Sequence, residues 1–381
     1  MTADLPDVPD RPMRVLYVMH TAAPDGSSAS LQHLITALSA DDVDPFVVTR
    51  DGPVAAALRR SGVTVLPIGG VAMLHSIRGM ALRGRRSIEL GRTALNLRHG
   101  RSLGAAIARV GPDIVHLNER GMLQAAVIAR RSGAAVVMHA RSVADPRPAW
   151  VARLSREVIR RNVDRVIAID GSVRRSIGTT PDVDIVYNPV VGTDLPRAAA
   201  APGRADPGSL TRAPADAGDG RIRVLYLASL APAKGIWDFV AAAERLRAHP
   251  GVRFTIAGTN GRSAAFHRSL AGRLAQLSGL IPDVETALRR HVARTGLGAS
   301  IELVGHVAEP AELLRASDIL VFPSHHDGPG RSVLEAAVEG VPAVVALEHR
   351  IEDVVVDGVT GLIVPPRDPA ALAAAIARLV D

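Results

Sequence analysis

The segment RVLYVM (residues 14–19) has a close copy in the second half of the chain, RVLYLA (residues 223–228). Each is a short, almost wholly apolar run, followed by a loop of small residues and then by a stretch with helical character. A run of this kind predicts a strand that is buried on both faces of a parallel sheet. The repeat therefore predicts two similar domains, each built from alternating strands and helices.

Further apolar runs follow in both halves, and segments rich in Ala, Leu and Arg separate most of them. This alternation predicts right-handed βαβ units and a doubly wound, Rossmann-like sheet in each half. The predicted fold class is α/β, and ligands are expected at the carboxyl ends of the strands. The additional predicted strands are residues 45–49, 63–68, 113–117, 135–139, 165–169, 184–187, 252–257, 301–304, 318–322, 342–346 and 361–364.

The expected domain boundaries follow from a change in composition. Residues 196–220 are dominated by Ala, Pro, Gly and Asp, with almost no large apolar residue, so we expect a flexible linker there. The domains expected on either side are residues 1–195 and 221–381. A chain of 381 residues is long enough for two domains with full cores.

Composition excludes several classes of protein. The chain has no cysteine, which rules out a disulfide framework or a thiolate zinc site. No run approaches the roughly 18 apolar residues of a membrane span. The start, residues 1–12, is acidic and rich in proline, unlike a signal peptide. We expect a cytoplasmic protein, with peripheral contact at the inner membrane face as an additional setting.

The net charge of +7 comes from the first half of the chain. Residues 1–195 contain 25 Arg against 18 acidic residues, whereas residues 196–381 contain 20 Lys and Arg against 20 acidic residues. The excess predicts an anionic partner for the first half, either a phosphorylated or lipid-linked acceptor or an acidic membrane surface. Nucleic acid is not expected, because 3 Tyr, 2 Trp and 5 Phe offer few rings for base stacking.

Lys234 is the one lysine in the chain, against 44 arginines, and lies in the loop APAKG (residues 231–235). A lysine ammonium is a compact charge on a flexible stem, whereas guanidinium is a broad planar fork. One interpretation is that this loop must reach a single phosphate oxygen inside a narrow turn. The other is that the lysine survived by drift.

A second loop follows the predicted strand 318–322 and ends in a predicted helix, residues 333–339. Gly328 and Gly330 precede the helix, and glycines there let backbone N–H groups approach an anion. The helix N-terminus adds partial positive charge. The segment therefore has the form of a phosphate-binding loop.

Two carboxylates flank these glycines. Asp327 precedes them and Glu335 lies in the predicted helix, and each can accept hydrogen bonds from the vicinal hydroxyls of a sugar or ribose. Structural interpretations stay open for both. Glu335 completes a capping box with Ser332, and Asp327 is a common residue type in a turn before glycine.

The stretch from Ser324 to Val344 resembles the nucleotide-sugar site of the GT4-type retaining glycosyltransferases. Their motif is an acid, seven residues and a Glu, then a helix of small residues and a Gly-x-Pro-x-Val turn; it spans 327–344 here. The loop around Lys234 is similar to the Gly-Arg-Leu-x-x-x-Lys-Gly segment of the same family. Similar pieces also occur, in the family's order, at residues 26–27, 112–116, 136–139, 164–168, 186–189, 357–364 and 368–372.

The resemblance implies the GT-B fold, in which two doubly wound Rossmann-like domains face a central cleft. It implies that Lys234 holds the donor diphosphate, Glu335 binds the nucleotide ribose and Asp327 touches the transferred sugar. The candidate catalytic residues are His139, Lys234 and Asp327. The other donor-binding candidates are Gly26, Ser27, Ser229, Gly258, Gly305, Gly328, Gly330, Arg331, Ser332 and Glu335.

Three histidines, His20, His116 and His139, fall at the predicted carboxyl ends of strands in the first half. The resemblance places His139 near the reacting face of the sugar, and His20, His116 and Arg141 are acceptor-side candidates. A structural role is the alternative for His116. Three histidines could bind zinc, but no metal-binding motif accompanies them. We therefore expect no metal and no cofactor, only a nucleotide-diphosphate sugar as co-substrate.

Three departures from the family pattern matter. Ser229 stands where the family often has an Arg, so Arg331 is a candidate to complete the diphosphate clamp. Asp327 replaces the more usual Glu and is one methylene shorter. The chain ends after the predicted helix 370–380, whereas the family commonly continues, so altered domain closure or a shortened product is expected.

The sequence predicts a metal-independent retaining glycosyltransferase. The first domain is expected to hold a lipid-linked, polysaccharide or small-molecule acceptor, and the second is expected to hold the nucleotide-sugar. The alternatives are a catalytically weak nucleotide-sugar-binding scaffold and a non-hydrolysing nucleotide-sugar epimerase of the same fold. The base, the sugar and the acceptor are not specified by any local pattern.

Overall fold

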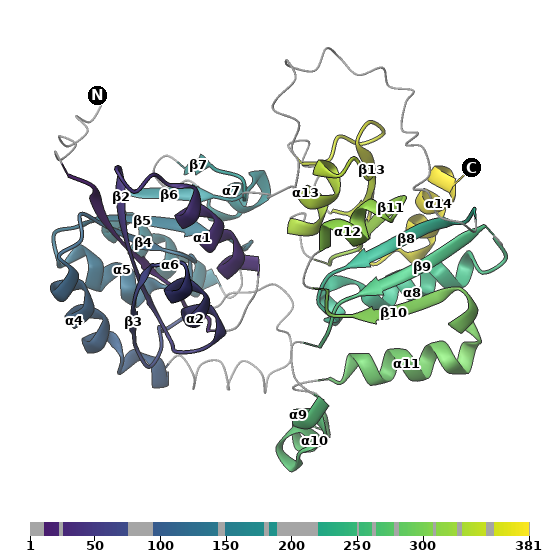
Figure 1. Ribbon diagram of the computed structural model, residues 1–381, viewed down its shortest axis with the longest axis horizontal. Helices are drawn as coiled ribbons and strands as arrows, with labels where there is room; N and C mark the ends of the chain where they lie inside the picture. The colour runs from purple at the N-terminus through teal and green to yellow at the C-terminus, as the bar shows by residue number, and fades with distance from the viewer. Residues whose placement is uncertain are drawn as a thin grey trace. The chain divides into compact units, whose positions relative to one another are not determined.

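The structure is a computed structural model, and the chain divides into two compact units, Met1–Pro189 and Val190–Asp381 (Figure 1). Except for Gly220, the expected linker lies outside the described residues. The structure describes residues 11–22, 26–74, 94–143, 149–178, 183–188, 220–249, 251–260, 264–277, 282–307, 310–325, 330–347 and 354–380.

Unit 1 contains a seven-stranded sheet in the order β3-β2-β1-β4-β5-β6-β7. Every neighbouring pair of strands is parallel. The strands are β1 (Met13–Val18), β2 (Val43–Thr49), β3 (Thr64–Pro67), β4 (Ile114–Leu117), β5 (Ala135–Ala140), β6 (Arg165–Ala168) and β7 (Val183–Ile185). The helices are α1 (Gly26–Ala37), α2 (Pro53–Arg60), α4 (Gly100–Val110), α5 (Leu123–Arg130), α6 (Ala149–Asn162) and α7 (Gly171–Ile177).

Both faces of this sheet are buried, as the apolar run 14–19 predicts. Leu16 and Val18 of β1 point into one cluster with residues of α4, α5 and α6. Val15 and Tyr17 point into the opposite cluster with residues of α1 and α2. Successive strand residues alternate between faces, so both sets of side chains must be apolar. The carboxyl edge of the sheet, where the strand ends emerge, is left to polar groups.

Unit 2 contains a six-stranded parallel sheet in the order β10-β9-β8-β11-β12-β13. The strands are β8 (Ile222–Leu227), β9 (Val252–Ala257), β10 (Ile301–Gly305), β11 (Ile319–Phe322), β12 (Ala343–Ala346) and β13 (Gly361–Val364). The helices are η1 (Pro232–Lys234), α8 (Ile236–Arg245), α9 (Ala264–Arg268), α10 (Leu270–Leu277), α11 (Val284–Thr295), η2 (Leu297–Ala299), α12 (Pro310–Arg315), α13 (Arg331–Val338) and α14 (Pro369–Val380).

The faces of the second sheet are also buried. α8, α11 and α14 contribute to the cluster on one face, and α12 and α13 contribute to the cluster on the other. Two Rossmann-like α/β units with parallel sheets are present, which confirms the predicted fold class. Each predicted strand is found within two residues of its expected bounds.

One local expectation was wrong. Helix α13 begins at Arg331, two residues earlier than predicted, with Gly330 at its N-cap and no side-chain cap hydrogen bond. Ser332 is therefore the second residue of the helix and cannot be its cap. The capping box of Ser332 and Glu335 is therefore not formed.

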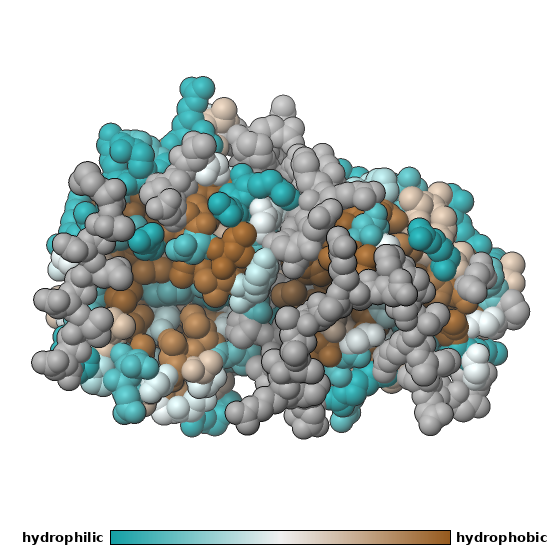
Figure 2. All heavy atoms as spheres, turned by 90° about the horizontal axis from the view of Figure 1, so that it is seen from above, coloured by the Kyte–Doolittle hydropathy of each residue, from teal (hydrophilic) through white to brown (hydrophobic). Residues whose placement is uncertain are grey.

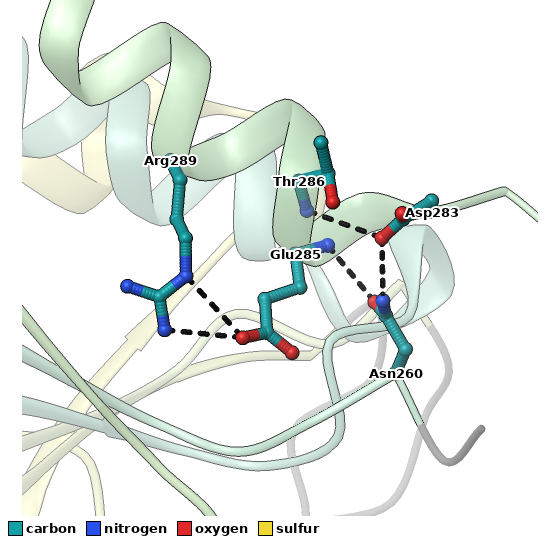
Figure 3. Close-up of polar contacts among 5 residues, drawn as sticks. All are labelled: Asn260, Asp283, Glu285, Thr286 and Arg289. Carbon is teal, nitrogen blue, oxygen red and sulfur yellow. Dashed lines mark hydrogen bonds and ion pairs between the residues drawn. The ribbon is translucent and has the colours of Figure 1, made fainter. Parts of the chain in front are cut away.

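The N-terminus of α11 is anchored to the end of β9 by polar contacts (Figure 3). The Asp283 carboxylate caps the helix by accepting from the Thr286 N–H at 3.1 Å, a common N-cap arrangement. Asn260 donates to that carboxylate at 2.8 Å and accepts from the Glu285 N–H at 2.9 Å. These bonds fix the loop after Gly258 at the carboxyl edge of the sheet.

The described surface of each unit mixes polar and apolar residues (Figure 2). Single apolar residues on a surface are normal. Among the described helices, none combines the length and apolar character that crossing a membrane requires.

Candidate functional site

In unit 2, the carboxyl ends of neighbouring strands converge. The Gly258 N–H donates to the Gly305 carbonyl at 2.7 Å, joining the ends of β9 and β10. The Leu230 N–H donates to the Thr259 carbonyl at 3.0 Å, joining the ends of β8 and β9. Ser229 is exposed at this edge. Ser229, Gly258 and Gly305, three of the donor-binding candidates, are thus brought to one sheet edge.

The turn that carries Lys234 is held against the loop after β11. Gly235 has a φ of +71°, and a Cβ built on it would lie 1.7 Å from the Pro323 carbonyl oxygen. Only glycine fits there, for both reasons. The His325 N–H also donates to the Ala233 carbonyl at 3.0 Å. The lysine and the loop leading toward Asp327 are therefore fixed side by side.

The Lys234 ammonium is mostly buried, and burial lowers its pKa. Its nitrogen lies 5.2 Å from the centroid of the Phe322 ring, a cation–π contact. Within the part of the chain that the structure describes, no carboxylate forms an ion pair with it. A buried cation without an anionic partner destabilises a fold. The arrangement therefore suits an anionic ligand.

The N-terminus of α13 lies against the same ring. A Cβ on Gly330 would lie 2.4 Å from the Phe322 ring, so glycine lets the helix start pack there. The first N–H groups of a helix have no partner within the helix, and Gly330 at the N-cap has no side chain to cap them. An anion at this position would meet backbone N–H groups as well as the Phe322-packed ammonium.

Two donor-binding candidates pair with each other. Arg331 Nε donates to Glu335 Oε1 at 2.6 Å, and both side chains are mostly buried. Arg331 thus orients the carboxylate that is the candidate for ribose. Ser332, also a donor candidate, is buried beside them. Asp327 and Gly328 lie outside the described residues.

Unit 1 brings its candidates to the middle of its sheet. His116 lies in β4 and His139 in β5, and their rings meet edge to face with centroids 5.5 Å apart. His20 follows β1, and Gly26 and Ser27 begin α1. The Ser27 carbonyl accepts from Asn118 Nδ2 at 3.3 Å, which ties the start of α1 to the end of β4.

Both central histidines are buried and neutral. Burial, followed by the Arg141 charge, lowers the pKa of His116 to about 3. The same two causes, with a smaller effect of His116, lower the pKa of His139 to about 2. Both ring nitrogens of His116 and Nε2 of His139 are buried without a hydrogen-bond partner among the described residues.

Arg141 links these elements. Its Nε donates to Asn118 Oδ1 and its Nη1 to Asn188 Oδ1, both at 2.7 Å. Its Nη2 lies 3.3 Å from His139 Nδ1. One guanidinium thus contacts groups from β4, β5 and the segment after β7.

Sequence reasoning missed several polar groups at these edges. Asn118 and Asn188 hold Arg141, and His325 pairs with Asp238 at 2.7 Å beside the Lys234 turn. Asn118 directly follows a predicted strand, and His325 lies in the loop after another. These positions after strands could have identified both residues as candidates for the carboxyl edge of a sheet. Glu119 was also missed; its carboxylate is buried, and burial raises its pKa.

No metal site is evident in the described part of the chain. No group of three or more His, Asp or Glu side chains with suitable geometry occurs among those residues. The three histidines that could have bound zinc do not form such a group.

Comparison with known families gives a consistent result for both units. Residues 24–191 match the model described as "Glycosyltransferase Family 4", and residues 221–381 match the model described as "Glycosyl transferases group 1". Two Rossmann-like units carrying these two domain types define a GT-B glycosyltransferase fold. The chain belongs to the GT4-type glycosyltransferases, as its motifs predicted.

Among curated proteins, glycogen synthase of Mycobacterium tuberculosis is 34% identical over 42% of this chain and 34% of its own length. A D-inositol 3-phosphate glycosyltransferase of Kineococcus radiotolerans is 32% identical over 57% of this chain and 49% of its own length. The chain thus matches between a third and a half of the length of these relatives.

Solved structures show the same fold. HepE of Anabaena in complex with UDP superposes with a TM-score of 0.70 at 17% identity, covering 97% of this chain and 90% of that one. Sucrose-phosphate synthase of Thermosynechococcus elongatus gives a TM-score of 0.63 at 19% identity over 97% and 90% of the two chains.

Proposed function

We propose that the chain transfers a sugar from a nucleotide-diphosphate sugar to an anionic or lipid-linked acceptor, with retention of configuration and without a metal ion. The observation that carries the proposal is the mostly buried Lys234 ammonium, which has no carboxylate partner in the described structure and contacts the Phe322 ring against which the start of α13 also packs. These are the groups that a diphosphate needs.

The chemistry follows from charge. As the bond between the anomeric carbon and the diphosphate oxygen breaks, negative charge builds on the diphosphate, while the acceptor hydroxyl oxygen bonds to the anomeric carbon and passes its proton to the departing diphosphate oxygen. A cation held in place before the reaction stabilises that charge without reorganising. Lys234 and the N–H groups of α13 take this role, and Glu335 binds the ribose.

The test is nucleotide release by the purified chain from a panel of UDP-, GDP- and ADP-sugars, with and without membrane extract as a source of acceptor. Release that depends on acceptor, with labelled sugar recovered in a product of retained configuration, supports the proposal. Turnover of nucleotide-sugar alone indicates an epimerase, and binding without turnover under every condition indicates a scaffold. Either result overturns transfer.

The matched variants are Lys234→Met, in the turn before α8, and Arg245→Met, at the last residue of α8. Arg245 is exposed and ends the helix, so its loss should leave donor binding unchanged. Thermal shift with free UDP, GDP and ADP then separates the bases. The wild type and Arg245→Met should be stabilised by one nucleotide, and Lys234→Met by none.

For the acceptor side, we propose that unit 1 meets an anionic membrane surface through α6. Trp150 and Leu154 lie one helical turn apart with exposures of 67% and 48%, and exposed Arg153 and Arg156 flank them. Exposed Trp and Leu beside arginines suit the interface of an anionic bilayer. This combination, rather than apolar exposure alone, supports the contact.

Cosedimentation with vesicles of neutral or anionic lipid tests this contact. Trp150→Ser with Leu154→Ser should lose binding to anionic vesicles. The control is Leu270→Ser with Leu274→Ser, an equally spaced pair on α10 of unit 2 with exposures of 75% and 58%. Equal loss in both double variants, or no binding by the wild type, rules out α6 as the contact.

A further inference from the structure

Arg141 has a contact for each of its three nitrogens, and the contacts come from three different strand ends. The two asparagine oxygens, of Asn118 and Asn188, each lie 2.7 Å from a guanidinium nitrogen. They hold the guanidinium plane, and the remaining nitrogen lies 3.3 Å from His139 Nδ1. Two hydrogen bonds, to Asn118 and Asn188, therefore hold the guanidinium in place, and its third nitrogen faces the His139 ring.

The chemistry of the pair fixes the proton on the ring. Guanidinium carries only donors and stays protonated in proteins, so it must donate in this contact. His139 Nδ1 must then accept, which requires it to carry no proton. A neutral imidazole has one proton, and it must therefore be on Nε2. The low pKa of His139 agrees with a neutral ring.

The surroundings of His139 leave that Nε2–H free for a ligand. Nε2 is buried and has no partner among the described residues. The titratable and charged groups around the ring are Arg141 and His116, with Tyr17 stacked on the far side of His116 at 5.0 Å. In the described structure, no carboxylate bonds to either imidazole, so nothing there would favour a charged ring.

We propose that Arg141 is a positioning residue that locks His139 in the neutral state with its proton on Nε2. His139 then presents a hydrogen-bond donor to a substrate oxygen and does not act as a general base. Asn118 extends the lock, because the same side chain that braces Arg141 donates to the Ser27 carbonyl at the start of α1. The catalytic consequence rests on the proposed function, whereas the tautomer does not.

Nitrogen-15 NMR of histidine-labelled protein tests the tautomer directly, and His139→Gln assigns the signal. The wild type should show an unprotonated Nδ1 and a protonated Nε2 that do not change between pH 5 and 8. Arg141→Met should show a mixture of tautomers of a ring that stays neutral over that range, because the burial remains. Arg141→Lys, which keeps one cationic donor, should restore part of the wild-type pattern. Arg109→Met, an exposed arginine on α4, is the control and should match the wild type.

Kinetics give the second readout. Arg141→Met should lower kcat about 10- to 100-fold, the loss expected for one misdirected hydrogen bond in a buried site. The donor KM should change little. Asn188→Ala, which removes one brace and keeps the guanidinium, should give a smaller effect of the same kind.

A protonated Nδ1 in the wild-type spectrum overturns the proposal. So does an Arg141→Met protein that stays folded, keeps the wild-type His139 signals and has an unchanged kcat. If Arg141→Met does not fold, the Arg141→Lys and Asn188→Ala spectra decide. The NMR test of the tautomer does not require sugar transfer. The tautomer proposal and the proposed function can therefore fail separately.

Discussion

The two buried histidines of unit 1 should make the protein sensitive to mild acid. Their folded pKa values, about 3 for His116 and about 2 for His139, lie below the ordinary value of 6.5. The unfolded chain therefore binds more protons below pH 6.5, so stability is full above about pH 7 and is lost as the pH falls toward 3. A pH of 5 lies 1.5 units below the pKa of each histidine in the unfolded chain. Each histidine therefore lowers the free energy of unfolding at pH 5 by about 2 kcal/mol, and the two together lower it by about 4 kcal/mol. This result does not depend on the folded values as long as both lie well below 5.

His116→Phe isolates one of the two contributions. Both nitrogens of His116 lack a hydrogen-bond partner among the described residues, so phenylalanine breaks no bond and keeps a ring against Tyr17. Between pH 7.5 and pH 5, the free energy of unfolding of the variant should fall by about 2 kcal/mol less than that of the wild type. The absolute stability can shift in either direction, since the new ring is slightly larger. The comparison is therefore made on the pH-dependence.

Urea unfolding at the two pH values, at constant ionic strength, measures the difference. Trp150 lies in unit 1 and Trp237 in unit 2, so a Trp237→Phe background gives a fluorescence signal from unit 1 alone. His99→Phe, at a partly exposed site in unit 1, is the control and should keep the wild-type acid loss. If His116→Phe loses as much stability as the wild type, the reasoning from burial is refuted.

Three further predictions concern unit 2. Lys234→Ala should lower kcat about 10²- to 10³-fold with a folded protein, as for loss of one preorganised charge, and Lys234→Arg should restore little, measured by nucleotide release. Gly235→Ala should destabilise the protein by about 2 kcal/mol or more in urea, because its Cβ meets the Pro323 carbonyl. Gly62→Ala, with a similar φ of +81° and open space around it, should lose only about 1 kcal/mol. Glu335→Gln should weaken nucleotide binding about 10-fold by calorimetry, through loss of one charged hydrogen-bond acceptor, and equal binding would contradict the ribose role.

The strands could be predicted because a parallel strand that is buried on both faces needs an unbroken apolar run. The sequence contains such a run at each strand. The loop residues were harder. The start of α13 was misplaced because Gly330, rather than Ser332, lets the helix pack against the Phe322 ring. That contact joins residues on either side of a loop and has no local pattern. Likewise, nothing in sequence spacing could place Asn188 beside Arg141, since their contact depends on β7 lying beyond β6.

Side chains that are expected to lower the stability of the fold lie at the carboxyl edges of the two sheets. Lys234 is buried with no anion from the described residues, and His116 and His139 keep buried nitrogens without partners there. Each such group lowers the stability of the empty protein, by the desolvation of a charge or of a polar atom. The partly exposed side chains of Asn260 and Asp283, by contrast, are paired with each other and with backbone N–H groups. Unpaired groups at the predicted ligand edges are consistent with selection for binding rather than for stability.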